Sequence, residues 1–280
     1  MKIVIDNDCG LCNKLWSIVN PVLWAQKHQK KIFLCSYDKN YKYFPSLSKN
    51  KYIVDPFIQF HPSIGYRLSH HLRLKLIYLS ERNKKLRKLL WRGWDSIHTK
   101  VESSDMPLVR EIFRPSESII NKLEEVFNEK RRKYDKIIGV HIRRGDYKDF
   151  FDGKYYYSFK DYLVIMLKLQ SRLKKKVCFF ISSNEEIPEE VFQEVPYFNF
   201  DKDTMSDLYG LSYCDYIIGP PSTFSMWAAF YSGTPIAVID KKNRPKYRFH
   251  TIASCLTFEK IEKCNEIPLI DNYGDTGIII

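Results

Sequence analysis

From residue 135 onward, short apolar runs alternate with amphipathic stretches, and this alternation constrains the fold more than any other feature. Apolar runs predict strands at 136–143, 177–182, 197–200, 216–219 and 235–240. Helical spacing between them predicts helices at 159–174, 188–194, 204–213 and 222–232. Strands that alternate with helices in this way are typical of a parallel, doubly wound sheet.

The N-terminal part predicts a second sheet of the same kind. Residues 2–5 and 31–35 have strand character, and 11–29 has helical spacing, which together make one βαβ unit. Residues 71–95 and 117–132 are predicted helices, and 40–70 is predicted to be irregular. We therefore expect an α/β protein with two Rossmann-like lobes and parallel sheets, at 1–130 and 131–250. Residues 251–280 are expected to pack back on the lobes.

The net charge of +12 is compatible with an anionic partner, although much of it is diffuse lysine, which more often serves solubility. Nucleic acid, an acidic membrane surface and a phosphorylated small molecule all fit this charge. The seven cysteines include several within apolar runs, such as Cys178, which favours a reducing compartment. No run approaches the roughly 20 apolar residues of a membrane span, and the chain opens on a strand pattern. We expect a cytoplasmic protein, with peripheral contact to the inner face of a membrane as an open alternative.

The first polar cluster, His141-Ile142-Arg143-Arg144-Gly145-Asp146-Tyr147, closes the predicted strand at 136–143. Ligands of open parallel sheets bind beyond the carboxyl ends of the strands. Arginine offers a rigid fork of donors that matches phosphate oxygens. Asp146 is placed to orient one guanidinium or to accept a proton. The alternative is an Arg–Asp ion pair at the surface.

The second cluster, Gly219 to Ala229, takes a strand through a tight turn into a helix. Its first turn carries Ser222, Thr223 and Ser225 around Phe224. The free N–H groups and positive end of a helix favour a phosphate. Capping by Ser222 is the structural alternative. Asp207, in the preceding helix, is a candidate to accept two hydrogen bonds from a guanine edge.

These segments resemble glycosyltransferase family 11, the α-1,2-fucosyltransferases, within the wider fucosyltransferase superfamily. The similarity lies in His141–Tyr147 and Ser222–Ala229, with Asp207-Leu208-Tyr209 at the family's usual distance. Gly10-Leu11-Cys12-Asn13 is similar to the family's opening Gly-Leu-Gly-Asn-Gln. The resemblance implies a GT-B-type fold, GDP-fucose as donor, a glycan acceptor, inversion at the anomeric carbon and no metal or other cofactor.

The resemblance also implies roles for single residues. Arg143 would clamp the β-phosphate with Arg144 beside it, and Ser222, Thr223, Phe224 and Ser225 would hold the diphosphate. His141 and Asp207 would read the guanine, and Asn13 would face the reacting centre. Asp146 is a catalytic candidate, although Asp149 and Asp152 are equally placed as the base, and a route with only a weak base also stays open.

Three competing interpretations rest on other motifs. Asp6-Asn7-Asp8 and Asp201-Lys202-Asp203 are similar to the Asp-x-Asp pairs of metal-dependent glycosyltransferases. Cys9 and Cys12 form a Cys-x-x-Cys pattern that is typical of thiol–disulfide chemistry. The basic segment 82–88 with Trp91 and Trp94 is compatible with nucleic-acid binding. We favour a surface or membrane role for that segment and no nucleic-acid partner.

Overall fold

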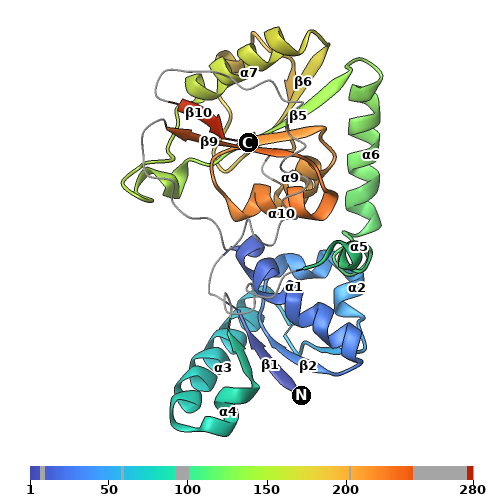
Figure 1. Cartoon of the computed structure of the whole chain (residues 1–280), viewed down its shortest axis with the longest axis vertical. Helices are drawn as coiled ribbons and strands as arrows, with labels where there is room; N and C mark the ends of the chain where they lie inside the picture. Colours follow the sequence, from blue (N-terminus) through green and yellow to red (C-terminus); the bar gives the residue numbers. More distant parts are fainter. Residues whose placement is uncertain (7–9, 58–59, 93–100, 202, 242–275, 280) are drawn as a thin grey trace. The chain divides into compact units, whose positions relative to one another are not determined.

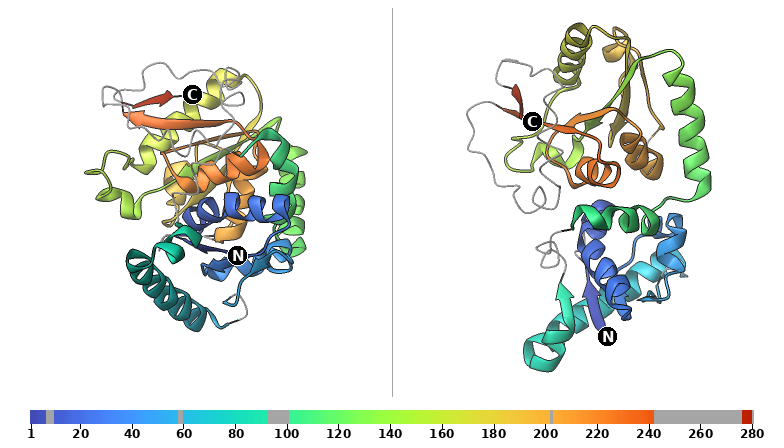
Figure 2. Two further views of the ribbon diagram at one scale, coloured as in Figure 1. Left: turned by 60° about the horizontal axis from the view of Figure 1, so that its bottom comes forward. Right: turned by 45° about the vertical axis from the view of Figure 1, so that its right-hand side comes forward.

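The computed structural model describes residues 1–6, 10–57, 60–92, 101–201, 203–241 and 276–279. The chain forms two compact units, Met1–Ser116 and Glu117–Ile280, and each contains its own sheet (Figures 1 and 2). Within the described ranges, no helix has the length and apolar character needed to cross a membrane.

The first unit is a four-stranded parallel sheet with the order β3-β2-β1-β4. Helix α1 packs against β1 and β2. Helix α3 packs against Ile3, Phe33 and Cys35 through Leu72 and Leu76. The elements are β1 (Lys2–Ile5), α1 (Leu11–His28), β2 (Ile32–Cys35), η1 (Lys39–Tyr43), α2 (Pro45–Ser48), β3 (Ile53–Val54), α3 (Pro62–Arg82), α4 (Lys84–Leu89), β4 (Leu90–Arg92), η3 (Ser103–Asp105) and α5 (Met106–Ile112).

The predicted helix at 71–95 is confirmed only in part, and α3 begins at Pro62, within the stretch 40–70 that was predicted to be irregular. The stretch 71–95 contains the end of α3, the short helix α4 and strand β4. Asn83 separates the two helices, because its side chain accepts hydrogen bonds from the backbone of Lys85 and Leu86 and caps α4. Strand β4 then pairs with β1, a long-range contact that local periodicity does not reveal.

The second unit is a six-stranded sheet with the order β10-β9-β8-β5-β6-β7. All neighbours pair in parallel except β10, which runs antiparallel to β9 at the edge. The predicted strands and helices of this unit are confirmed, with ends that differ by a few residues. The elements are α6 (Glu117–Arg131), β5 (Lys136–Ile142), η4 (Gly145–Lys148), α7 (Phe159–Leu173), β6 (Val177–Ser183), α8 (Glu189–Phe192), β7 (Tyr197–Phe198), α9 (Thr204–Ser212), β8 (Tyr216–Gly219), α10 (Thr223–Ser232), β9 (Ile236–Lys241) and β10 (Thr276–Ile279).

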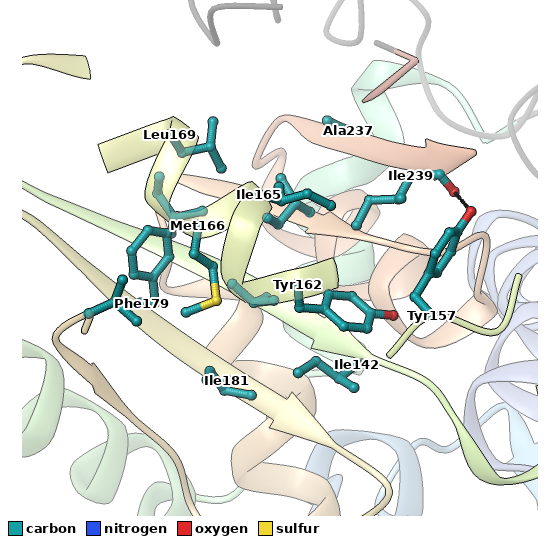
Figure 3. Packing of buried hydrophobic residues seen from close by; sticks show 14 of the residues in the cluster. Ile142, Tyr157, Tyr162, Ile165, Met166, Leu169, Phe179, Ile181, Ala237 and Ile239 are labelled. Atoms are coloured by element: carbon teal, nitrogen blue, oxygen red, sulfur yellow. Dashed lines mark hydrogen bonds between the residues drawn. The ribbon is translucent and has the colours of Figure 1, made fainter. Parts of the chain in front are cut away.

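Helix α7 covers one face of this sheet and forms its main hydrophobic core (Figure 3). Ser158 and Asp161 form a capping box at the start of the helix. The apolar stripe of α7 then packs against Phe179 and Ile181 of β6 and Ile142 of β5. This core holds the carboxyl end of β5 in place. The first polar cluster lies at that end.

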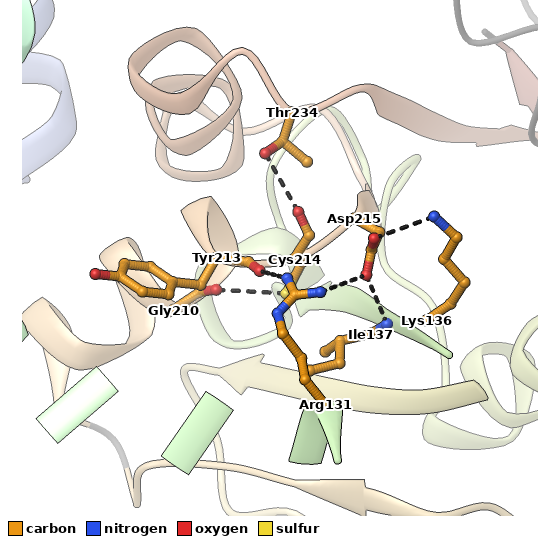
Figure 4. A network of polar contacts seen from close by, with 8 residues as sticks. All are labelled: Arg131, Lys136, Ile137, Gly210, Tyr213, Cys214, Asp215 and Thr234. Atoms are coloured by element: carbon orange, nitrogen blue, oxygen red, sulfur yellow. Dashed lines mark hydrogen bonds and ion pairs between the residues drawn. The ribbon is translucent and has the colours of Figure 1, made fainter. Parts of the chain in front are cut away.

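The chain divides into its two compact units at 116/117, whereas the predicted boundary lies at 130/131. Arg131, the last residue of α6, donates to the Asp215 carboxylate (3.3 Å) and to the Tyr213 carbonyl (2.6 Å) (Figure 4). Asp215 also accepts from Lys136 and from the backbone of Ile137, at the start of β5. Helix α6 therefore belongs to the second unit. The predicted C-terminal segment is described only at 276–279, as β10.

Candidate donor-binding site

The strand order of the second unit reverses beside β5. From β5 the chain adds β6 and β7 on one side, and α9 then returns it to β8 on the other side. In an open parallel sheet, ligands bind where the strand order reverses, beyond the carboxyl ends of the two strands. Both polar clusters predicted from the sequence follow these two strands, His141–Tyr147 after β5 and Gly219–Ser225 after β8.

Arg143 presents a partly exposed guanidinium at the tip of β5. Its Nε lies 2.8 Å from Asp146 Oδ1 and its Nη2 donates to Oδ2 at 3.0 Å, so the carboxylate grips the guanidinium with both oxygens. The Arg143 side chain is 37% exposed and that of Asp146 is 57% exposed. Asp146 therefore orients Arg143 while leaving part of the cation open to a ligand. The pair agrees with both predicted alternatives, a carboxylate that orients one guanidinium and an Arg–Asp ion pair at the surface.

Arg144 points to the other side and holds its own loop. Its Nε donates to Glu185 (2.7 Å), its Nη1 to the Tyr157 carbonyl (2.9 Å) and its Nη2 to the Tyr156 hydroxyl (2.5 Å). The guanidinium also lies over the ring of Phe159. These contacts give Arg144 a structural role, and its contact with a donor stays a prediction.

Asn184 and Glu185, directly after β6, fix the backbone of the arginine loop, the segment 143–148 that follows β5. Asn184 accepts from the Arg144 N–H and Glu185 accepts from the Gly145 N–H, each at 2.9 Å. Burial raises the pKa of Glu185, but the bonds from Arg144 and Gly145 outweigh it and hold the pKa below its usual value. Gly145 has φ +26°, and a Cβ there would meet Asn184 Nδ2 at 2.6 Å. The sequence analysis missed Glu185, although its place after a predicted strand was a usable signal.

Tyr147 joins the two polar clusters. Its hydroxyl donates to the Pro221 carbonyl and is also hydrogen-bonded to Ser222, in the turn before α10. Arg143 lies over the same ring, 5.8 Å from the centroid. Burial raises the pKa of Tyr147 to about 12, so the phenol stays protonated and keeps its donor. Through this side chain the arginine loop and the start of α10 form one site.

His141 is buried beside this junction. Its ring packs on Phe224 with 5.2 Å between centroids, and its backbone lies against Gly219, where an added Cβ would meet the His141 carbonyl at 2.7 Å. Burial, together with the nearby Arg143 charge, lowers the pKa of His141 to about 3, so the imidazole is neutral. Its Nδ1 is buried and has no hydrogen-bond partner in the described protein. Such an atom is costly to leave unsatisfied, which suits a site that a ligand completes.

The four predicted phosphate-binding residues at the start of α10 differ in exposure and in their hydrogen bonds. Ser222 caps the helix by accepting from the Phe224 N–H at 3.3 Å. Thr223 and Phe224 are half-buried. Ser225 is fully buried and donates to the Ser222 carbonyl. Ser225 therefore has a hydrogen-bond partner within the helix, and its contact with a donor stays a prediction.

Asp207 faces a cavity of about 340 Å³ beside β6. Ser183, Glu185 and Asn199 are among its polar lining residues. The Asp207 carboxyl is 6% exposed and is hydrogen-bonded to Ser182, and its Oδ1 has no partner in the described protein. Burial, reinforced by the Asp203 charge, raises the pKa of Asp207 to about 7.

The remaining predicted residues lie in the first unit, are bonded to other protein groups or fall outside the described residues. Asn13 lies in the first turn of α1, in the first unit, and its catalytic role stays a prediction. Asp203 caps α9 and pairs with Lys122 at 2.9 Å, while Asn7 and Asp8 fall outside the described residues. In the described ranges, no three His, Cys, Asp or Glu side chains are grouped as metal ligands would be.

The structure also bears on the two other interpretations. Cys12 is buried in α1, whereas Cys9 falls outside the described residues. Trp91 packs edge-on against Trp24, 5.0 Å between centroids, so its ring belongs to the fold of the first unit. Trp94 falls outside the described residues.

Comparison with solved structures shows the same fold in fucosyltransferases. NodZ from Bradyrhizobium is 16% identical, with a TM-score of 0.54 over 84% of this chain and 94% of that chain. POFUT1 in complex with GDP-fucose is 12% identical, with a TM-score of 0.54 over 84% and 96%. FUT1 from Arabidopsis thaliana is 10% identical, with a TM-score of 0.52 over 88% and 71%. The expected GT-B-type fold is confirmed. No curated protein matched the sequence.

A sequence profile described as Glycosyl transferase family 11 matches residues 92–262, which is more than half of the chain. The match spans β5, the arginine loop, Asp207 and α10, the elements of the candidate site. This chain is therefore a member of glycosyl transferase family 11.

Proposed function

We propose that this glycosyltransferase moves L-fucose from GDP-fucose to a glycan hydroxyl, with inversion at the anomeric carbon and an α-1,2 linkage. The linkage and the inversion rest on the family resemblance. Solved structures of similar fold that contain GDP or GDP-fucose support the donor. The observation that carries the proposal is the partly exposed Arg143 guanidinium, oriented by Asp146 where β5 and β8 end.

Arg143 supplies the charge that sugar transfer needs. As the bond between the sugar and the diphosphate breaks, negative charge grows on the β-phosphate. A fixed guanidinium at that position stabilises the transition state more than the ground state. Asp146 holds the fork in place before the substrate arrives, so little reorganisation is needed when charge develops.

The start of α10 receives the diphosphate. The backbone N–H groups of its first turn and the positive end of the helix attract phosphate oxygens, and Ser222 and Thr223 add hydroxyl groups. Tyr147 keeps this turn joined to the arginine loop. The arginine loop and the start of α10 are therefore already held together before the donor binds.

Asp207 and His141 read the guanine. A carboxylate accepts from both the N1–H and the N2–H of guanine, and the unpartnered Asp207 Oδ1 offers one of these acceptors. The neutral His141 has its Nδ1 free for a further bond. Uracil offers one N–H with carbonyls on both sides, so this arrangement favours a guanine nucleotide over a uridine nucleotide.

The transfer needs no metal ion in this proposal, because Arg143 and α10 balance the diphosphate charge. EDTA is expected to leave the initial rate unchanged, and added Mn²⁺ is expected to have no effect. An absolute requirement for Mn²⁺ would contradict this part of the proposal. The base that accepts the proton of the acceptor hydroxyl stays open among Asp146, Asp149 and Asp152, and Asn13 remains a candidate on the acceptor side.

A two-stage experiment on the full chain tests the proposal. Thermal shifts with GDP, UDP, ADP and CMP first identify the nucleotide, and we expect stabilisation by GDP alone. GDP-fucose, GDP-mannose and GDP-glucose are then compared in a GDP-release assay with a panel of free galactosides as acceptors. The proposed donor would be wrong if UDP stabilised the protein as much as GDP does, or if GDP were released only from GDP-mannose or GDP-glucose.

A further inference from the structure

Helices α3 and α4 expose more apolar side chain than any other part of the described structure. Seven of the eleven large apolar residues that stay exposed lie on these two helices. They are Ile64, Tyr66, Leu68, Leu74, Tyr78, Leu79 and Leu89. Helix α6 shows the usual arrangement, because its Ile119, Leu123 and Phe127 are all buried. A concentration of this kind marks an interaction surface.

The exposed side chains of α3 follow a helical repeat of their own. A stripe of buried and half-buried residues, Gly65, Ser69, Leu72, Leu76 and Ser80, packs on the rest of the first unit. A second stripe at 64, 68, 71, 75, 78, 79 and 82 has the same spacing of three to four residues, so it runs along another side of the helix. All seven of its residues are exposed, and they mix apolar and basic side chains.

Nearly all the charged residues of this surface are cationic. Residues 62–89 contain eight arginines and lysines and a single acid, Glu81. Seven of the eight cations are exposed, and only Arg73 is half-buried beside His70. Helix α4 carries four of them on six residues, Lys84, Lys85, Arg87 and Lys88. The α3–α4 surface therefore combines exposed aliphatic side chains with a dense field of positive charge.

We propose that the α3–α4 surface docks this protein on an anionic lipid membrane. Anionic headgroups balance the cations, and the aliphatic side chains enter the boundary between headgroups and acyl chains. Figure 1 shows the two helices side by side at one edge of the first unit, where α3 spans about 30 Å of helix. This docking is independent of the proposed function.

Two other partners fit this surface less well. A nucleic acid balances the charge, but it leaves Ile64, Leu68 and Leu74 in water, and the Trp91 ring that could stack on a base packs on Trp24. A second copy of the chain covers the apolar residues, but it brings two strongly basic surfaces together, which is unfavourable.

Vesicle sedimentation of the full chain tests the proposal. Vesicles of phosphatidylcholine are compared with an equal mixture of phosphatidylcholine and phosphatidylglycerol, across a salt series. One variant reverses charge on α4, Lys84→Glu/Lys85→Glu/Lys88→Glu, and another removes apolar groups from α3, Ile64→Ser/Leu68→Ser. The control Lys30→Glu/Lys31→Glu/Lys175→Glu makes the same change in net charge at exposed sites elsewhere. Thermal melts and GDP affinity verify that every variant is folded.

We expect binding only to vesicles that contain phosphatidylglycerol, and weaker binding as salt rises. The α4 variant should bind at least about tenfold more weakly, and the α3 variant several-fold more weakly at every salt concentration. The control should bind as the wild type does. An equal loss in the control would overturn the proposal, because any basic surface would then suffice. The proposal also fails if the α3 variant binds normally, if single-stranded oligonucleotide retardation exceeds vesicle binding, or if light scattering shows a dimer that the α3 variant abolishes.

Discussion

The buried polar groups beyond the carboxyl ends of the strands differ between the two sheets. At the edge of the first sheet, buried polar side chains bond one another. Ser36 donates to the Asp6 carboxylate and shares a hydrogen bond with the Tyr41 hydroxyl, while Lys14 donates to the Tyr37 carbonyl. At the edge of the second sheet, the buried atoms His141 Nδ1 and Asp207 Oδ1 have no partner in the described protein.

This difference separates polar groups that stabilise a fold from polar groups that wait for a ligand. A satisfied buried network adds stability and order, whereas an unsatisfied buried atom costs free energy that a ligand can recover. Asp6 and Asp207 are both buried aspartates near strand ends, at 8% and 6% exposure. Their surroundings assign them different roles, and substitutions at the two edges should therefore have different effects.

The largest expected effect is on catalysis at Arg143. Arg143→Ala should reduce kcat by about a thousandfold, because the charge on the departing GDP is then unmatched. Arg143→Lys should recover only part of the rate, since a lysine lacks the fork that Asp146 grips. Initial rates with GDP-fucose and thermal melts measure this. The matched control Arg132→Ala, at an exposed arginine after α6, should be neutral, and a rate for Arg143→Ala near that of the wild type would remove the proposed mechanism.

The second effect is on base recognition. Asp207→Asn should weaken GDP binding by about ten- to a hundredfold and leave the weaker UDP binding unchanged, because the amide presents a donor to a guanine donor. Isothermal titration of both nucleotides measures this. If GDP and UDP affinity fall together, Asp207 does not read the base.

The pKa of Asp207, raised to about 7, makes two pH profiles predictable. Guanine binding needs the deprotonated carboxylate, so the Kd for GDP should rise by up to about tenfold per pH unit below pH 7. Without ligand, the folded chain keeps a proton between about pH 4 and 7 that the unfolded chain has lost. The free energy of unfolding should therefore fall as pH rises through this range, and Asp207→Asn should remove that fall. GDP titrations and urea melts across pH test both, and a Kd that does not vary with pH would exclude the proposed contact.

A smaller effect is expected at Glu185, which positions Arg144 and Gly145. Glu185→Gln should lower kcat by about tenfold and stability by about 1 kcal/mol, since its amide meets an N–H donor of the loop. The Kd for GDP should change less than kcat does, because Asp207 and α10 keep their geometry while Glu185 lines only part of the cavity. Glu194→Gln, at an exposed site of the same unit outside the cavity lining, serves as control, and a fall in stability alone would reduce Glu185 to a structural residue.

The smallest expected effect on the donor is at the first sheet. Asp6→Asn should cost about 1–3 kcal/mol of unfolding free energy, because Ser36 loses its charged acceptor. GDP affinity should not change. Urea melts and GDP titration measure both, and weaker GDP binding in a fully folded variant would mean that the two edges are not as different as their hydrogen bonds indicate.

The sequence by itself determined the elements of the second unit. Strand β5 is a continuous apolar run and α7 is amphipathic with its own capping box, so local periodicity was enough to predict both. The positions of Arg143 and Ser222, each directly after a strand, were equally visible. The order of the strands, which brings these residues together at a switch point, was not predicted from the sequence and came only with the structure.

Only the tertiary structure decided what each polar side chain does there. Arg143 and Arg144 are adjacent and identical in type, but one pairs with Asp146 beyond the end of β5 and the other bonds Glu185 and Tyr157 within the loop. Ser225 is buried by the packing of α10, and β4 and α6 take their places through long-range contacts with β1 and Asp215. The physical reason is that periodicity records which side of an element is apolar, whereas hydrogen-bond partners and burial depend on residues far away in the chain.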